Sequence, residues 1–463
     1  MSSLDKLPPE ILTEIISHLH HGENETSANG WTRRRYLMSL RAVNHMLHQL
    51  VTPLLFERIF IYSGSRVKIN NTFTYLFKET GVQRLDKLSL EPSLRKMVRT
   101  LEFSVMPPYC DSWGFSEGES EEKHLQYIAR ISALIHSALP RFPNLTALKL
   151  NFWDIISESY EDIGDNFEFD SLLCVQDSKD IIQSFSTAIY GSGLEKLEEL
   201  DLSLFLGRDY GHFLYDENEV ESSSTSILFK QLKRLRVHVA NSTDDEYEAS
   251  EVYGKYVQEL LPLASNLESL RVRSPEGLRL TASALPHSHL RLLDLHTSRI
   301  AEEALVSVIQ RCKSLQEVSL NDVIIESGTW EQILKALGKT SIIKLTIGSC
   351  GYGLDEDRTH EYLHYLDQFH LITTRIEDLK ACVAVFTQVH ENIQRIYAGS
   401  CEVNTITLTA AEQAEEVRKI LEIPEARSWQ EFRPDEGDEN DSEDDDFWTT
   451  SNIDLGPNEL FID

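Results

Sequence analysis

The sequence predicts an α/β protein in which a small helical N-terminal domain precedes a curved solenoid of strand-helix repeats and a disordered acidic tail. A short apolar pattern of the strand type returns eight times between residues 98 and 347. Stretches with helical spacing lie between the later copies. The predicted boundaries are 1–60 for the helical domain, 61–93 for a linker or helical cap, 94–430 for the repeat domain with its C-terminal cap, and 431–463 for the tail.

The first predicted element is a short amphipathic helix that begins with prolines. Leu7-Pro8-Pro9-Glu10-Ile11-Leu12 places Pro where the first turn of a helix tolerates it, and Glu14 follows on the side of the positive helix end. Apolar residues recur at three- and four-residue spacing: Leu7, Pro8, Ile11, Leu12, Ile15, Ile16 and Leu19. Because they cover more than a single buried stripe, part of this surface is expected to need a second partner.

A second amphipathic run follows a polar loop and is predicted to end before Pro53-Leu54-Leu55-Phe56. Its apolar members are Tyr36, Leu37, Leu40, Val43, Leu47 and Leu50. Two helices and this apolar exit fill about fifty residues, and a unit of that size has a marginal core of its own. The N-terminal unit is therefore expected to be stabilised by a partner surface.

These residues resemble the F-box family, whose pattern L-P-x-E-I-L, Leu and Val on a following helix, and P-L-L-F is common in fungal members; the resemblance covers roughly residues 4 to 60. It implies docking on the Skp adaptor of a cullin-RING ubiquitin ligase. The implied adaptor-binding residues are Leu7, Pro8, Ile11, Leu12, Ile15, Leu19, Leu40, Val43 and Leu47. The chain departs from the pattern in a long loop at 20–35 and in lacking the late Trp, where His45-Met46-Leu47-His48 stands, so a weaker adaptor contact is expected.

The repeated pattern is an apolar residue, two variable residues, a second apolar residue, one variable residue and a third apolar residue. Its eight copies begin at Val98, Leu145, Leu197, Leu232, Leu267, Leu290, Leu315 and Ile342. The last four start 23, 25 and 27 residues apart, within the 20 to 29 of leucine-rich repeats, and the wider earlier spacings imply insertions. In a strand the second and third apolar side chains point to one face. Ala301 to Ile309 and Trp330 to Leu337 are predicted to form helices of the outer layer.

This pattern resembles the irregular leucine-rich repeats that accompany many F-boxes, and it implies that substrate binds at the outward strand positions. These are Ala147-Lys149-Asn151, Glu199-Asp201-Ser203, Arg234-Arg236-His238, Ser269-Arg271-Arg273, Leu292-Asp294-His296, Glu317-Ser319-Asn321 and Lys344-Thr346-Gly348. Arg234, Arg236, Arg271 and Arg273 fall on two consecutive copies. Such a cluster suits an acidic or phosphorylated peptide, because Arg pairs bidentately with these groups. The alternative is a solvated strand face balanced by Glu199, Glu268 and Asp294.

One motif indicates an enzyme instead. His360-Glu361-Tyr362-Leu363-His364 matches H-E-x-x-H, in which two His bind zinc and Glu activates water. However, Asp367 replaces the Gly that turns the longer form of this motif toward a third ligand at His370, and every Met precedes the motif. The surrounding aromatic and aliphatic residues predict a packing helix. We therefore predict no catalytic residue, metal or cofactor, and keep a zinc metalloprotease as the alternative enzymatic hypothesis.

Composition limits the remaining classes of function. The formal net charge of -31 disfavours binding to nucleic acid or to an anionic membrane, both of which need Lys and Arg. Residues 434–463 hold twelve of the acidic residues and no Lys or Arg, and such a block repels itself and stays disordered. Six scattered Cys without a C-x-x-C pair predict reduced thiols. With no secretion signal or membrane span in the sequence, a cytoplasmic or nuclear location is expected.

Overall fold

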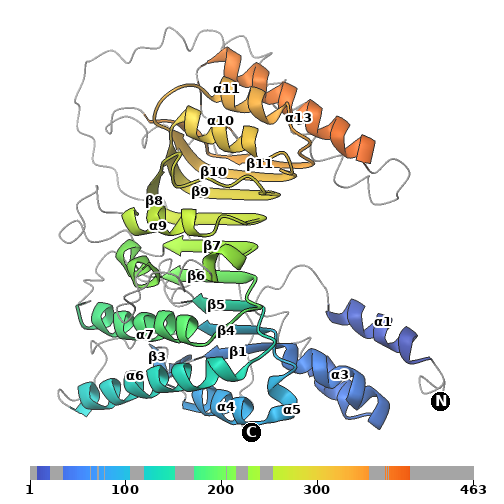
Figure 1. Cartoon of the computed structure of the whole chain (residues 1–463), viewed down its shortest axis with the longest axis vertical. Helices are drawn as coiled ribbons and strands as arrows, with labels where there is room; N and C mark the ends of the chain where they lie inside the picture. The colour runs from blue at the N-terminus through green and yellow to red at the C-terminus, as the bar shows by residue number, and fades with distance from the viewer. Residues whose placement is uncertain are drawn as a thin grey trace.

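The computed structural model describes residues 8–20, 35–62, 64–69, 72–77, 79–104, 119–151, 172–204, 206–214, 228–239, 254–353, 371, 373 and 375–396. The predicted acidic tail and the His360 to His364 motif lie outside these residues. In the described part, one parallel sheet forms the spine of the molecule, and its strands are stacked in sequence order (Figure 1). The mixed α/β class with a long parallel sheet agrees with the prediction.

The sheet is built from strands that each come from one repeat. Its order is β1 (Arg58–Tyr62), β4 (Thr100–Ser104), β5 (Ala147–Asn151), β6 (Glu199–Leu204), β7 (Arg234–Val239), β8 (Ser269–Leu280), β9 (Leu292–Ile300), β10 (Glu317–Ile325) and β11 (Lys344–Gly348), and the short β12 (Gly351–Tyr352) also pairs with β10. Every neighbouring pair is parallel. All eight predicted copies are thus strands of one sheet.

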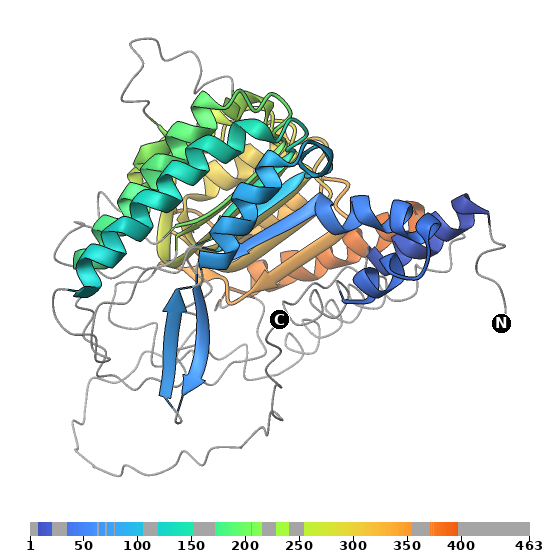
Figure 2. The same ribbon diagram turned by 90° about the horizontal axis from the view of Figure 1, so that it is seen from below.

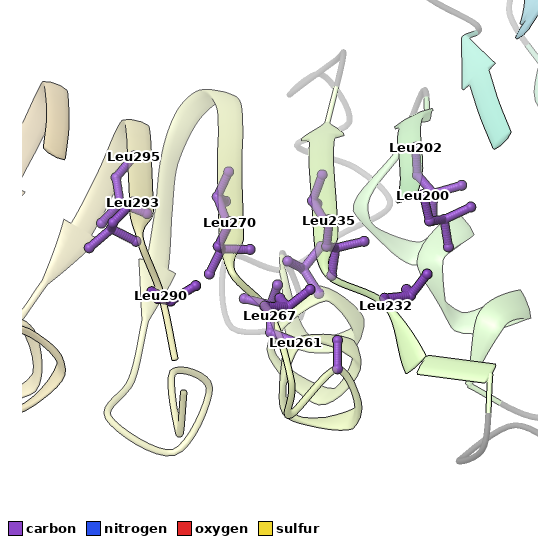
Figure 3. Packing of buried hydrophobic residues seen from close by; sticks show 14 of the residues in the cluster. Leu200, Leu202, Leu232, Leu235, Leu261, Leu267, Leu270, Leu290, Leu293 and Leu295 are labelled. Atoms are coloured by element: carbon purple, nitrogen blue, oxygen red, sulfur yellow. The ribbon is translucent and has the colours of Figure 1, made fainter. Parts of the chain in front are cut away.

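The register between strands equals the alignment of the repeats. Leu200 pairs with Leu235, Leu235 with Leu270, and Leu270 with Leu293, so equivalent leucines form continuous rows (Figure 3). The second and third apolar residues of all eight copies are buried, as alternation in a strand requires. The first apolar residue of each copy is also almost completely buried. Each repeat therefore buries its apolar face against its neighbours, which explains why the pattern tolerates insertions between copies.

A ladder of hydrogen bonds ties each repeat to the one before it. The backbone carbonyl of the residue after the first apolar position accepts a hydrogen bond from a backbone N–H of the next repeat. Examples are Lys233 N–H to Glu198 O and Glu268 N–H to Lys233 O, both 2.8 Å. The residue before the first apolar position often donates a side-chain hydrogen bond to a backbone carbonyl of the preceding repeat. Asn144 Nδ2 donates to Lys96 O at 2.8 Å, and Asn266 Nδ2 donates to Lys230 O at 2.7 Å. These polar positions satisfy carbonyls that the strands leave unpaired.

Helices cover the apolar face of the sheet on one side (Figure 2). The main members are α6 (Glu119–Ala138), α7 (Leu172–Gly191), α9 (Lys255–Leu260), α10 (Glu302–Arg311) and α11 (Trp330–Leu337). Phe185 of α7 packs edge to face on Phe103 of β4, with ring centroids 4.6 Å apart. The two helices predicted at Ala301 to Ile309 and Trp330 to Leu337 correspond to α10 and α11, and their apolar residues are buried.

The C-terminal end of the described repeats is covered by α13 (Ile376–Ile396) (Figure 1). Asp378 of this helix is fully buried and accepts hydrogen bonds from Glu331 N–H at 2.8 Å, the Tyr352 hydroxyl at 2.5 Å and the Thr373 hydroxyl at 2.7 Å. Asn392 donates to Ile342 O at 3.0 Å. One carboxylate thus joins α13 to the start of α11 and to β12, which closes the last repeat.

The N-terminal part differs from the prediction in its helices. The first helix, α1 (Pro9–His20), forms as predicted, with Leu12 N–H bonded to Pro8 O. The predicted second run is two helices, at 35–41 and in α3 (His45–Glu57). Asn44 separates them, because its side chain accepts from Leu47 N–H at 2.8 Å and so caps α3. The prediction that the run ends before Pro53 is wrong, since α3 continues through this residue.

The sheet begins earlier than the predicted boundary at residue 94. Strand β1 follows α3 directly and pairs in register with β4, placing Ile59 beside Leu101 and Ile61 beside Phe103. Phe56-x-x-Ile59-x-Ile61 is a further copy of the repeat pattern, which the prediction assigned to the N-terminal domain instead. The predicted linker contains an antiparallel hairpin, β2 (Gly64–Ile69) and β3 (Thr72–Phe77), and the helices α4 (Glu79–Leu90) and α5 (Pro92–Arg95).

Candidate protein-binding surfaces

The N-terminal helices expose about half of the apolar residues proposed for adaptor binding. Ile11 and Ile15 on α1 are each 43% exposed, and Val43 is 65% exposed. Pro8 is exposed as well, and Leu40 is half-buried. Tyr36 and Met38 on the helix at 35–41 add to the exposed apolar set. Leu7 and the side chain of Leu19 lie outside the described residues.

Two members of the set are buried instead. Leu12 and Leu47 are buried, and Leu47 packs in a small cluster with Ile16, Leu37 and Val51. The side chain of Arg41 adds a hydrogen bond from Nε to Thr52 Oγ1 at 3.0 Å. The structure thus divides a set that the sequence could not divide: Leu12 and Leu47 form the interior, whereas Pro8, Ile11, Ile15 and Val43 face outward.

The N-terminal cluster is joined to the repeats through one aromatic side chain. Phe56, at the end of α3, packs against both the small helical cluster and the large core of the sheet. Because α3 leads into β1 without an intervening loop, the exposed apolar residues are attached directly to the end of the sheet (Figure 1). A protein bound to the helices would therefore be held beside the edge strand β1.

The four arginines of the predicted cluster lie side by side on β7 and β8. Arg236 pairs in register with Arg271, and Arg273 lies two residues further along β8, next to His238 of β7. Neighbouring strands are about 4.8 Å apart, so the guanidinium groups share one region of the surface. The predicted proximity of these residues is therefore found in the structure.

Three of the four arginines already have a carboxylate partner from a neighbouring strand. Arg234 Nε lies 2.8 Å from Glu199 Oε2, Arg236 Nη1 lies 3.3 Å from Asp201 Oδ2, and Arg271 Nε lies 3.8 Å from Asp294 Oδ2. Burial raises the pKa of Asp201, and Arg236 and Lys149 oppose that rise. This part of the surface is a network of paired charges, as the alternative of a balanced strand face describes. Asp201, and not Glu268, completes the set of balancing carboxylates.

Two histidines, both predicted to occupy outward strand positions, flank the fourth arginine. Arg273 pairs in register with His238 on one side and with His296 of β9 on the other. Burial, followed by Arg273, lowers the pKa of His238 to about 4, and the same two causes lower the pKa of His296. The buried Tyr210 hydroxyl is bonded to the backbone of two of these strands, at 2.7 Å from His238 O on β7 and 3.0 Å from Leu202 O on β6. The alternation of inward and outward side chains along each strand is what predicts that both histidines lie on the outward face.

Two other kinds of site were tested on the described residues: a metal centre and a reactive thiol. No group of three or more His, Cys, Asp or Glu side chains in this part of the chain is arranged to hold a metal ion. Cys312, Cys350 and Cys382 are buried free thiols, and burial raises the pKa of each. Raised thiol pKa values disfavour the reactive thiolate. No helix in the described portion is both long enough and apolar enough to cross a membrane.

Comparisons with known proteins do not assign a family. No protein-family model matches the chain, and no curated protein matches it. Among solved structures, it is similar to a chain in the crystal structure of the Rad7 and Elc1 complex in yeast. The two are 14% identical with a TM-score of 0.25, and the match covers 76% of this chain and 91% of that chain. A likeness at this level transfers neither fold nor function.

Proposed function

We propose that this chain is the substrate-recognition subunit of a Skp-cullin-F-box type ubiquitin ligase. In this proposal the N-terminal helices bind the Skp adaptor, and the outward face of the parallel sheet binds a protein substrate. The chain itself performs no bond chemistry. It raises the local concentration of substrate lysines near the ubiquitin-conjugating enzyme by holding two proteins on one scaffold.

The observation that carries the proposal is the exposure of Ile11 and Ile15 on α1 and of Val43 in the turn before α3, in a segment whose motif resembles the F-box. Single exposed apolar residues are common on protein surfaces, but a group of them on a small helical unit marks a site of interaction. The buried partners Leu12 and Leu47 show why the unit folds without using these residues. Direct continuation of α3 into β1 supports a scaffold that connects two binding surfaces.

The proposal is tested by binding of the full-length chain to purified Skp adaptor. We expect Ile11→Asp combined with Ile15→Asp to weaken adaptor binding by at least tenfold, because both substitutions place a charge in an apolar interface. Leu90→Asp is the matched control, since Leu90 is 58% exposed but lies on α4. Loss of binding in the control alone would contradict the assignment of the surface.

Co-purification from cells then separates the ligase from its alternative. Recovery of adaptor together with cullin supports the ligase, whereas recovery of adaptor without cullin supports a scaffold that works outside ubiquitination. Recovery of neither protein would remove the proposed function. The comparison uses the same two variants, so that any adaptor recovered can be attributed to residues 11 and 15.

A further inference from the structure

The strand β11 is the last strand of the sheet, and among the described residues only one of its two edges has a partner strand. Lys344 N–H bonds to Gln316 O at the start of β10, and alternate residues of a parallel strand bond to opposite neighbours. Leu345 therefore directs its backbone N–H and C=O away from β10. An open edge of this kind is a template for pairing with another strand.

The packing of the last repeat shows the same open side. Leu270 and Leu293, at the second apolar position of inner copies, are fully buried, whereas Leu345 at that position of β11 is 6% exposed. Helix α13 covers the apolar side of this repeat and shares its core. The terminal repeat of a solenoid also needs an element that covers its outer end. For β11, that element would be one more strand.

Helix α13 returns the chain to the side of the sheet where the strands begin (Figure 1). Asp378, in the first turn of this helix, accepts a hydrogen bond from Tyr352, which follows β11 in the chain. Asn392, near the end of the helix, donates to the carbonyl of Ile342, two residues before β11 begins. The chain therefore leaves α13 where the next strand of a parallel sheet would start, as a crossover helix requires.

The sequence after α13 contains a further copy of the repeat pattern, beyond the predicted eight. Residues 403–408 read Val403-Asn-Thr-Ile406-Thr-Leu408, without a charged residue, Pro or Gly, and they lie outside the described residues. Val, Ile and Thr are β-branched and favour strands.

The connection from α13 to this copy has a suitable length. It consists of residues 397–402, and the corresponding connections in other repeats are 192–196 after α7, 312–314 after α10 and 338–341 after α11. Six residues can span about 20 Å, which is several times the distance between neighbouring strands. The copy can therefore reach the edge of β11.

We propose that the open edge of β11 binds residues 403–408 of this same chain as a further parallel strand. In the register that the other repeats share, Ile406 lies beside Leu345 on the apolar side, and Thr407 lies beside Thr346 on the outward face. The added strand ends the outward face in uncharged hydroxyl groups. It also removes an edge through which two copies of the chain could pair. The inference does not rest on the proposed ligase function.

The test is backbone hydrogen exchange of the full-length chain, followed by mass spectrometry of the peptides that contain residues 403–408 or Leu345. Amides bonded within a sheet exchange slowly, because they must first open. We expect slow exchange in both peptides of the unsubstituted chain. Ile406→Asp is expected to speed the exchange of both by at least about tenfold, because it places a charge on the apolar side of the sheet.

Thr407→Asp is the matched control, since it adds the same charge one residue away, on the outward side. It is expected to change the exchange of both peptides by less than about twofold. Peptides from β5 and β6 report whether each variant keeps the rest of the sheet. If Ile406→Asp also opens β5 and β6, the milder pair Ile406→Ala and Thr407→Ala repeats the comparison, with the same difference expected.

Three results would each overturn the inference: rapid exchange of residues 403–408 in the unsubstituted chain, equal effects of the substitutions at Ile406 and Thr407, or unchanged exchange at Leu345 when Ile406 is replaced. A second copy of the chain is the competing occupant of the edge. In that case, exchange at Leu345 slows as the protein concentration rises while residues 403–408 exchange rapidly, and this result also removes the proposed strand.

Discussion

The N-terminal helices and the parallel sheet contain the same kinds of apolar residue at regular spacing, and they bury them to different extents. In the sheet, Leu270 is completely buried because strands lie on both sides of it and helices cover its face. In α1, Leu12 and Ile16 are buried, but Ile11 and Ile15 of the same helix are each 43% exposed. The helices have packing partners on one side, whereas an inner strand of the sheet has them in three directions.

This difference indicates which apolar residues maintain the fold and which are available for binding. A buried residue in the sheet contributes through the area it removes from water, at about 25 cal/mol per Å². An exposed residue on the helices contributes little until another protein covers it. Stability measurements and binding measurements should therefore respond to different residues, even where the residue type is the same.

The largest effect is expected in the sheet. Leu270→Ala should lower the free energy of unfolding by about 4 kcal/mol, because the strands on both sides limit the collapse of the cavity. The same substitution at Leu47, in the small N-terminal cluster, should cost about 2 kcal/mol, since fewer groups surround it. The urea midpoint followed by circular dichroism measures both. An equal cost at the two positions would mean that the N-terminal cluster is packed as tightly as the sheet.

A pH-dependent loss of stability is expected from a buried histidine in the repeats. Burial lowers the pKa of His287 to about 4 from its ordinary 6.5, and its Nδ1 has no hydrogen-bond partner among the described residues. Between pH 6.5 and 4 the unfolded chain binds a proton at this residue that the folded chain does not bind. The free energy of unfolding should therefore fall as pH decreases through this window, by up to about 3 kcal/mol.

Substitution of His287 separates its contribution to the pH dependence of stability from the contributions of other titrating groups. His287→Gln should reduce the slope of the pH profile between 6.5 and 4 and leave the contribution of His238, whose pKa is also lowered to about 4. The fold should tolerate this change because Gln can still donate to Leu261 O, which His287 Nε2 now contacts at 3.2 Å. His289→Gln, at an exposed position two residues away, is the matched control. If both variants keep the slope of the unsubstituted chain, His287 is not the source of the pH dependence.

A smaller effect is expected at the C-terminal end of the repeats. Asp378→Ala removes the acceptor of three hydrogen bonds from Glu331, Thr373 and Tyr352, which should cost about 2 kcal/mol. Glu377→Ala changes the exposed acidic neighbour on the same helix and should remain within about 0.5 kcal/mol. Urea midpoints compare the two. A cost below that of the control would show that α13 does not depend on this carboxylate.

The sequence predicts the sheet well because its information is local. Alternation of apolar residues sets the buried face of each strand, and the pattern Leu232-x-x-Leu235-x-Val237 aligns with its neighbours without a shift. The same reasoning missed β1, because Phe56 and Ile59 had been assigned to the N-terminal motif. The hairpin at 64–77 also lies where only a linker or helical cap was expected.

The binding surfaces are less predictable because they depend on contacts between repeats. The pairing of Arg236 with Asp201 joins residues 35 positions apart, and its distance follows from the register and not from either repeat alone. Likewise, nothing in the spacing of α1 distinguishes buried Leu12 from exposed Ile11 until the helix at 35–41 and α3 are placed beside it. Composition and spacing give candidate residues, and packing decides among them.

The smallest effect on stability is expected at the N-terminal surface, where the effect on binding should be large. Val43→Ser removes an apolar side chain that is 65% exposed, so the free energy of unfolding should change by less than about 0.5 kcal/mol. Binding of purified Skp adaptor should nevertheless weaken about tenfold, because an interface would bury the lost methyl groups. Calorimetric titration measures the affinity, and the urea midpoint measures the fold. A stability loss equal to that of Leu47→Ala would place Val43 in the helical cluster and remove it from the proposed adaptor surface.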